Sequence, residues 1–168
     1  MTPDELPDYL RMVRDRVDPA GEAACNGMVQ AYDRGLKTNE LIRTTGRASA
    51  PGEPPALESG RLRGTLRSTK AVSAGAHRYR GSEYPTTVYA HIQEFGGDIW
   101  AKHTFVDRNG VTRPGFLRWE GPAGVHFARH VHLPERSYMR AGTRRMSADG
   151  TLRRGAVSAF MHEMGFTL

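Results

Sequence analysis

The chain has 168 residues, a length that fits one domain with a buried core. Its net charge of +6 favours nucleic acid or an acidic protein as a partner. No apolar run approaches the ~18 residues of a membrane span, and residues 1–16 lack the apolar segment of a signal peptide. We therefore expect no membrane partner. Cys25 is the only cysteine, which excludes a disulfide within the chain.

The composition also indicates a small core. Apolar residues make up 38% of the chain, which is low for a compact globule. The 19 glycines and 10 prolines predict long loops. We therefore expect one domain over residues 1–168, with a surface that is completed only in an assembly.

Two amphipathic helices are predicted at the N-terminus. The first begins with a capping box at residues 2–5, and its apolar residues recur at helical spacing as far as Val17. Asp18-Pro19 begins the second helix, for which Gly35 is the expected end. A short third helix is expected to follow.

Residues 46–60 interrupt this helical pattern. Their prolines and glycines exclude a continuous helix or strand, so we expect an exposed linker. Beyond the linker, Leu62 and Leu66 lie four residues apart, which predicts a short helix capped by Ser59. Its exposed side would carry Arg61, Arg63 and Arg67.

Alternating side chains predict antiparallel strands in the middle of the chain. The alternation in residues 85–95 indicates a strand ending at Phe95, where Gly96-Gly97 allows a sharp turn. Further strands are expected over residues 98–106, 115–121 and 124–133, with an Asn-Gly turn within 107–110 and Pro134 after the last strand.

Helical spacing returns at the C-terminus. Residues 138–146 predict one helix, and residues 147–150 separate it from a second helix within the tail, residues 147–168. The order of helices, linker, antiparallel strands and helices is typical of an α+β protein. We expect a small antiparallel β-sheet with the N- and C-terminal helices packed on one face.

Three histidines lie close together in the sequence. His126 and His130 would share a helical face, whereas His130 and His132 would share a strand face, so no regular conformation presents all three. Neither HExxH nor CxxC is present. We therefore expect packed or solvent-exposed histidines, and no metal or other cofactor.

Glu94 is a candidate for acid–base chemistry, because a carboxyl buried beside a second carboxylate can be a general acid. No motif marks a second carboxylate, so we expect Glu94 to pair with an arginine or to cap backbone at the strand end.

Cys25 lies on a helical stripe and is expected in the core. The sequence contains no GxSxG, phosphate loop or GxGxxG, and no catalytic residue is predicted.

Arginines form the most distinctive polar pattern. Arg136, Arg140 and Arg144 lie four residues apart, so one side of a helix would carry three guanidinium groups. Their repulsion predicts carboxylates or phosphates opposite them. Glu94 of the same chain or of a neighbouring subunit is one candidate partner, DNA is another, and a solvated face is the third alternative.

Three segments in order resemble one family of proteins. They are APGEPPALESGRLRGTLRS (50–68), VYAHIQEFGG (88–97) and FARHVHLPERSYMRAG (127–142). Together they resemble the head–tail joining, or tail-completion (neck), proteins of long-tailed bacteriophages. The matching positions are Gly60, Leu62, Arg63 and Ser68; Tyr89, Ala90, Glu94, Phe95 and Gly96; and Pro134, Arg136, Tyr138, Met139 and Arg140.

This resemblance implies a structural virion protein without enzymatic activity, made in the host cytoplasm and located in the phage neck. It implies a homo-oligomeric ring, with a hexamer favoured over a dodecamer, that contacts the head connector and tail proteins. Genomic DNA would pass through its lumen. Residues 88–97 are then expected at a structural strand end. The positions expected at interfaces are Gly60, Leu62, Arg63, Tyr89, Glu94, Phe95, Gly96, Arg136, Tyr138, Met139 and Arg140.

Two interpretations from other classes stay open. A basic nucleic-acid-binding module predicts strongly salt-dependent binding of DNA by the monomer. A small metal-dependent hydrolase that uses His126, His130 or His132 predicts stoichiometric metal in the purified protein.

Overall fold

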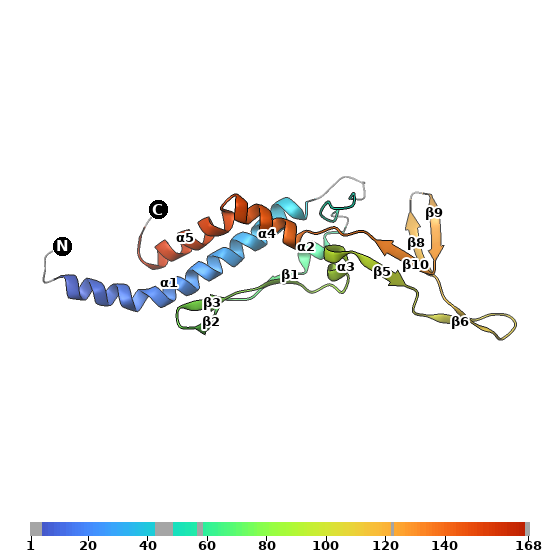
Figure 1. Cartoon of the computed structure of the whole chain (residues 1–168), viewed down its shortest axis with the longest axis horizontal. Helices are drawn as coiled ribbons and strands as arrows, with labels where there is room; N and C mark the ends of the chain where they lie inside the picture. Colours follow the sequence, from blue (N-terminus) through green and yellow to red (C-terminus); the bar gives the residue numbers. More distant parts are fainter. Residues whose placement is uncertain (1–4, 43–48, 57–58, 122, 167–168) are drawn as a thin grey trace.

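The computed structural model describes residues 5–42, 49–56, 59–121 and 123–166. The molecule is elongated, with its long helices towards one end and a group of β-hairpins at the other (Figure 1). Helix α1 (Leu6–Gly35) continues directly into a π-helical turn, η1 (Leu36–Glu40). No described helix is both long and apolar enough to cross a membrane.

Helix α1 is one helix, so the predicted division at Asp18-Pro19 is wrong. A proline inside a helix removes one hydrogen bond and crowds the preceding turn, which normally bends the helix. Pro19 lies within α1, and Figure 1 shows that the helix bends. Packing against α5 (Thr151–Glu163) and β3 (Arg78–Arg80) supports the helix beyond the bend. Most of the predicted capping box falls on residues 1–4, outside the described residues.

The two C-terminal helices are α4 (Met139–Ala148) and α5 (Thr151–Glu163), as the spacing predicts. Gly150 separates them at a φ of 75°, a left-handed conformation that glycine adopts without strain. Helix α5 lies along α1, where Gly27 and Gly155 face each other. A Cβ added to Gly27 would lie 2.6 Å from the Cβ of Ala159, so the missing side chain permits this close approach.

The strands of the described residues form five antiparallel two-stranded ladders. The α+β class, with antiparallel strands and terminal helices, is confirmed, but the described strands do not join into one continuous sheet. The pairs are β1 (Leu66–Ser68) with β4 (Glu83–Pro85), β2 (Val72–Gly75) with β3 (Arg78–Arg80), β5 (Gly97–Trp100) with β10 (His130–Leu133), β6 (Thr104–Val106) with β7 (Thr112–Pro114), and β8 (Leu117–Gly121) with β9 (Gly124–Ala128).

The predicted strand over residues 85–95 is wrong for most of its length. Residues 90–95 form helix α3 (Ala90–Phe95), in which Ala90 and Glu94 are both buried. These two residues lie four apart and share one helical face, a spacing that is also compatible with the alternation of a strand. The predicted turn at Gly96-Gly97 is confirmed, since both glycines have positive φ values.

Other predicted elements are shorter than expected. Helix α2 (Arg61–Gly64) ends before Leu66, which lies in β1. The predicted strand over residues 98–106 is divided into β5 and β6, and that over residues 124–133 is divided into β9 and β10. The Asn-Gly turn joins β6 to β7 as expected, and β10 ends immediately before Pro134.

The buried core is small and lies where η1, α2, β1, α3 and α4 meet. Its buried residues are Leu36, Leu41, Leu62, Leu66, Ala90, Tyr138 and Met146. Cys25 is only partly buried. The predicted linker is exposed only in part, because Pro55 is buried. The core therefore brings together segments that are far apart in the sequence, including all three segments on which the family resemblance rests.

Candidate functional site: the Glu94 junction

The carboxylate of Glu94 binds the N-terminal end of helix α4. Its Oε2 atom accepts hydrogen bonds from the backbone N–H groups of Tyr138 and Met139, at 2.8 and 2.9 Å. Its Oε1 atom accepts from the Ser137 hydroxyl at 2.8 Å and from the backbone N–H of Arg140 at 2.9 Å. Glu94 is 4% exposed, so a buried acid satisfies backbone donors that have no partner within the helix. We call Glu94, Phe95, Gly96 and residues 137–140 the Glu94 junction.

Arg140 closes the junction from the outside. Its Nε donates to Glu94 Oε1 at 3.1 Å, and its Nη2 donates both to the Glu94 carbonyl oxygen at 2.9 Å and to Glu135 Oε1 at 2.7 Å. The guanidinium also lies over the Phe95 ring, 4.6 Å from its centroid. The expected pairing of Glu94 with an arginine is confirmed within the chain. The expected cap lies at the start of α4, and the predicted capping of a strand end is wrong because residues 90–95 are helical.

Gly96 makes the sharp turn between α3 and β5 possible. Its φ of 69° is unfavourable for residues with a Cβ. A Cβ at this position would also lie 2.7 Å from the backbone nitrogen of Glu135 and 3.0 Å from the carbonyl oxygen of Leu133. Glycine is therefore required here by both the backbone conformation and the neighbouring chain.

The electrostatics favour an ionised Glu94. Burial opposes ionisation, but the hydrogen bonds from the Arg140 and Met139 backbone, the Ser137 hydroxyl and the Tyr138 backbone outweigh it. Together they hold the pKa of this carboxyl below its usual value. A carboxylate with this many donors around it is suited to fixing the position of helix α4, and poorly suited to giving up a proton as a general acid.

The first described residues of the linker are tied to the same region. The backbone N–H of Gly52 donates to the Glu135 carbonyl at 3.0 Å, and the Arg136 guanidinium donates to the Ser49 carbonyl at 3.3 Å. The backbone N–H of Arg136 donates to the Gln93 carbonyl at 2.8 Å. Residues 49–52, α3 and the approach to α4 therefore form one connected structure around Glu94.

The structure divides the positions of the family resemblance into three groups. Leu62, Ala90 and Tyr138 are in the core, with Tyr89 and Met139 packed against it. Glu94, Phe95, Gly96 and Arg140 form the junction described above. The remaining positions lie outside both groups: Gly60 begins α2 at a φ of 71°, Arg63 and Ser68 line a pocket beside α1, and Pro134 and Arg136 lie between β10 and α4.

The predicted arginine face is not a single face of a helix. Arg136 precedes the first residue of α4, so only Arg140 and Arg144 lie on that helix. Arg144 is exposed and has no hydrogen-bond or ion-pair partner within the described part of the chain. The neighbouring Arg145 instead donates to Oε1 of the buried Glu40 at 2.8 Å. The predicted carboxylate partner is therefore found for Arg140, and it is Glu94 of the same chain.

The three histidines are held in two separate contacts. His126 stacks on Trp119, with ring centroids 5.4 Å apart. His130 and His132 lie side by side on β10, 2.7 and 2.9 Å from the same oxygen of Asp98 on β5. The hydrogen bonds from these two histidines hold the pKa of Asp98 below its usual value. Within the described ranges, no group of three His, Cys, Asp or Glu side chains is placed to hold a metal ion.

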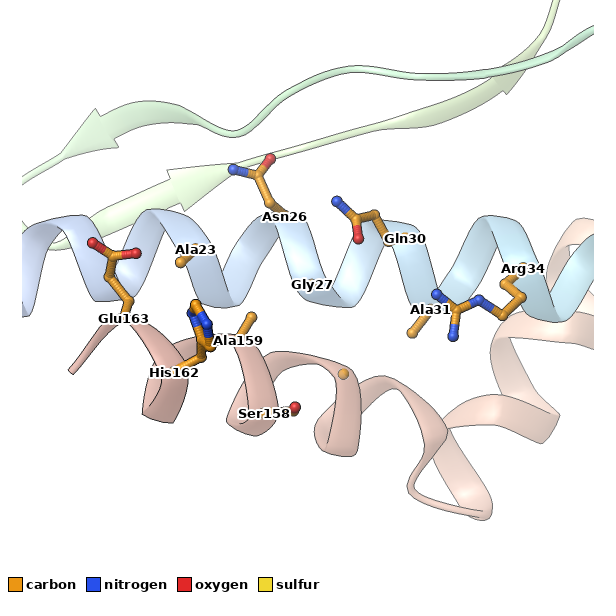
Figure 2. A pocket seen from close by; sticks show the side chains of 11 residues that line it. Ala23, Asn26, Gly27, Gln30, Ala31, Arg34, Ser158, Ala159, His162 and Glu163 are labelled. Atoms are coloured by element: carbon orange, nitrogen blue, oxygen red, sulfur yellow. The ribbon is translucent and has the colours of Figure 1, made fainter. Parts of the chain in front are cut away.

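A polar pocket of about 520 Å³ lies between α1 and α5 (Figure 2). It arises beside the close approach of Gly27 and Gly155, where small side chains leave room along the two helices. Its polar lining consists of Asn26, Gln30, Arg34, Ser158, His162 and Glu163. One of these groups already has a structural partner, because Asn26 Oδ1 accepts a hydrogen bond from the backbone of Ala71 at 2.7 Å.

Sequence reasoning missed two features of the site. The capping of α4 by Glu94 joins residues more than 40 positions apart, and no local pattern marks such a contact. The Glu40–Arg145 ion pair joins residues that lie even further apart, 105 positions, in the sequence. The contact between α1 and α5 does have a signal, because Ala23, Gly27 and Ala31 recur every fourth residue and form a stripe of small side chains.

Comparison of the chain with family models, with curated proteins and with solved structures finds no match. The function of the molecule must therefore be inferred from its own geometry and from the resemblance of the three sequence segments. The geometry adds one observation to that resemblance, which is that the three segments meet in space.

Proposed function

We propose that this chain is a non-enzymatic structural protein of the bacteriophage neck. It forms a ring, with six subunits favoured, that completes the tail and joins it to the head connector around the path of the DNA. The proposal assigns the protein to the virion. It needs no cofactor and no membrane.

The observation that carries the proposal is the convergence of the three resembling segments. Residues 50–68 contribute Leu62 to the core, residues 88–97 contribute Ala90, and residues 127–142 contribute Tyr138. The second and third segments are further joined by the contacts of Glu94 with residues 137–140. Segments that resemble one family and also build one structural centre support a shared fold more strongly than separate motifs do.

A second observation is the unusual exposure of apolar side chains. Large hydrophobic residues that are at least 40% exposed occur from Leu6 to Phe166 along the described chain, whereas the buried core is small. Exposed apolar surface of this kind is typical of protein–protein interfaces. An assembly subunit explains both properties, because neighbouring subunits would cover the surface that one chain leaves open.

The proposed function can be tested in phage particles. Disruption of the gene is expected to leave filled heads and separate tails that lack the completing ring, as seen by electron microscopy. Purified wild-type particles should contain the protein. Its copy number relative to the major capsid protein should correspond to one ring per particle. Joined, infectious particles that lack the protein would contradict the proposal.

A nucleic-acid-binding module is the second candidate, and the exposed cations favour it. Arg61, Arg63 and Arg67 are all exposed, and none of them forms an ion pair in the described part of the chain. Tight binding of double-stranded DNA by the isolated monomer, falling steeply with salt concentration, would support this function. A subunit that only surrounds DNA in a ring is expected to bind weakly as a monomer.

A further inference from the structure

One end of the molecule is an arm of β-hairpins without a core of its own. The arm consists of residues 97–121 and 123–133 and contains the β5–β10, β6–β7 and β8–β9 ladders (Figure 1). Among its described residues, only Gly115 is buried. Two-stranded ladders are marginally stable alone and normally need a covered apolar face. Large exposed apolar residues on the arm are Trp100, Phe105, Val106, Val111, Phe116, Trp119, Val125 and Phe127.

The opposite end of the molecule presents an uncovered amphipathic helix. The helical end, residues 5–15, consists of the first turns of α1, where Leu6, Tyr9 and Leu10 are 42%, 41% and 56% exposed. Arg16 donates to the carbonyl oxygen of Met164, just beyond the last residue of α5. The turns of α1 before Arg16 therefore extend past the end of α5, as Figure 1 also shows.

The two ends carry opposite net charge. The helical end has three acidic and two basic residues, a net charge of −1, in a chain whose total charge is +6. The arm has three acidic and five basic residues, a net charge of +2. Contacts between two arms or between two helical ends would therefore bring like charges together. A contact between an arm and a helical end is electrostatically complementary.

We infer that the arm of one copy of this chain docks on the helical end of the next copy. The occupant of each exposed surface is then a second copy, and each contact buries both apolar surfaces. Such a contact is heterologous, since it joins two different surfaces, and its repetition closes into a ring when the rotation between subunits permits. The inference rests on the proposed function for its ring, and adds to it the two surfaces that form the ring.

The test uses two single variants and one control, followed by sedimentation over a range of concentrations. Leu10→Glu places a charge on the helical end, and Phe127→Glu places one on the arm, where the side chain is 64% exposed. Each variant is expected to raise the concentration needed for self-association at least ~10-fold. Val88→Glu, at a residue that is 99% exposed and outside both surfaces, should assemble like the wild type. Circular dichroism melting should show that all three variants remain folded.

Mixing the two variants distinguishes a heterologous contact from a symmetric one. Leu10→Glu keeps an intact arm and Phe127→Glu keeps an intact helical end, so the mixture should form 1:1 heterodimers and no larger species. A wild-type chain that stays monomeric, a variant that assembles like the wild type, or a mixture without heterodimers would overturn the inference. The proposed neck function would survive each of these results if the protein still joins heads to tails, since that outcome is read from particles.

Discussion

The Arg140 side chain donates to Glu94 twice, to its carboxylate and to its backbone carbonyl oxygen, at 3.1 and 2.9 Å. The same carboxylate holds the first N–H groups of helix α4. This pair therefore fixes the C-terminal helices relative to α3, and the first two predictions concern its two members.

Glu94→Ala is expected to lower the free energy of unfolding by ~3–5 kcal/mol, because it leaves buried donors on Ser137 and α4 without an acceptor. Glu94→Gln keeps one acceptor oxygen and should cost less. Urea unfolding of both variants measures the effect, with Glu120→Gln as an exposed control. A free energy for Glu94→Ala within ~0.5 kcal/mol of the control would show that the junction does not stabilise the fold.

Arg140→Ala is expected to destabilise the protein more than Arg153→Ala. Arg140 contacts two carboxylates, a carbonyl oxygen and the Phe95 ring, whereas Arg153 is exposed and has no ion pair in the described ranges. Because the Arg140 side chain is 41% exposed, solvent screening limits the expected loss to ~1–2 kcal/mol. Thermal unfolding of the two variants gives the comparison, and equal melting temperatures would contradict it.

Gly96→Ala is expected to destabilise the protein for two separable reasons. The φ of residue 96 is positive, and the added Cβ would contact the backbone of residues 133–135. Gly110 supplies the control, because its φ is also positive, at +76°, and a Cβ there would meet nothing within 4 Å. The backbone strain alone costs ~1–2 kcal/mol at either position. The free energy of unfolding should therefore fall further for Gly96→Ala than for Gly110→Ala, and the difference measures the steric contact. Equal losses of unfolding free energy in the two variants would mean that the backbone of residues 133–135 moves aside without an energetic cost.

Gly27→Ala is expected to destabilise the contact between α1 and α5, although alanine is the better helix former. A glycine-to-alanine change inside a helix normally adds up to ~1 kcal/mol of stability. At Gly27 the added methyl group would meet the Gly155 backbone and the Cβ of Ala159. Overpacking of this kind costs ~1–3 kcal/mol. Gly64→Ala, in α2 and with nothing within 4 Å, is the control that should be neutral or stabilising in the same denaturation experiment.

The stability of the protein should depend on pH through Glu83. Both of its carboxylate oxygens are buried without a hydrogen-bond partner among the described residues. Burial and the nearby Asp33 carboxylate raise the pKa of Glu83 from 4.5 to about 7. Unfolded chains then lose this proton at a lower pH than folded chains, so the contribution of Glu83 to stability falls as the pH rises from about 4.5 to about 7.

Glu83→Gln removes this titration and isolates its effect from that of every other ionisable group. The variant should be more stable than the wild type at pH 8, and this advantage should shrink at pH 5. Urea unfolding of both proteins at the two pH values gives the comparison. An advantage of the same size at both pH values would contradict the predicted ionisation of Glu83.

The sequence by itself determined the elements that are fixed by local chemistry. The spacing of Leu152, Ala156 and Phe160 marks helix α5, and the Asn-Gly pair marks the β6–β7 turn. The glycines after Phe95 and the proline after β10 also act within a few residues of their own position. These features depend on backbone conformations that one or two residues allow or forbid, so they can be predicted without knowledge of the rest of the chain.

The tertiary structure determined the secondary structure of the segments whose local sequence pattern is compatible with more than one conformation. Residues 90–95 fit a strand and a helix equally well by spacing, and the helix lets Ala90 enter the core while Glu94 reaches the start of α4. Pro19 favours a helix end, yet the packing of α1 against α5 and β3 outweighs the bend that it introduces. In both cases the deciding contacts come from residues far along the chain. Their free energy exceeds the small local preference, and this is why the sequence pattern alone indicated a pairing of Glu94 with an arginine but could not reveal the capping of α4.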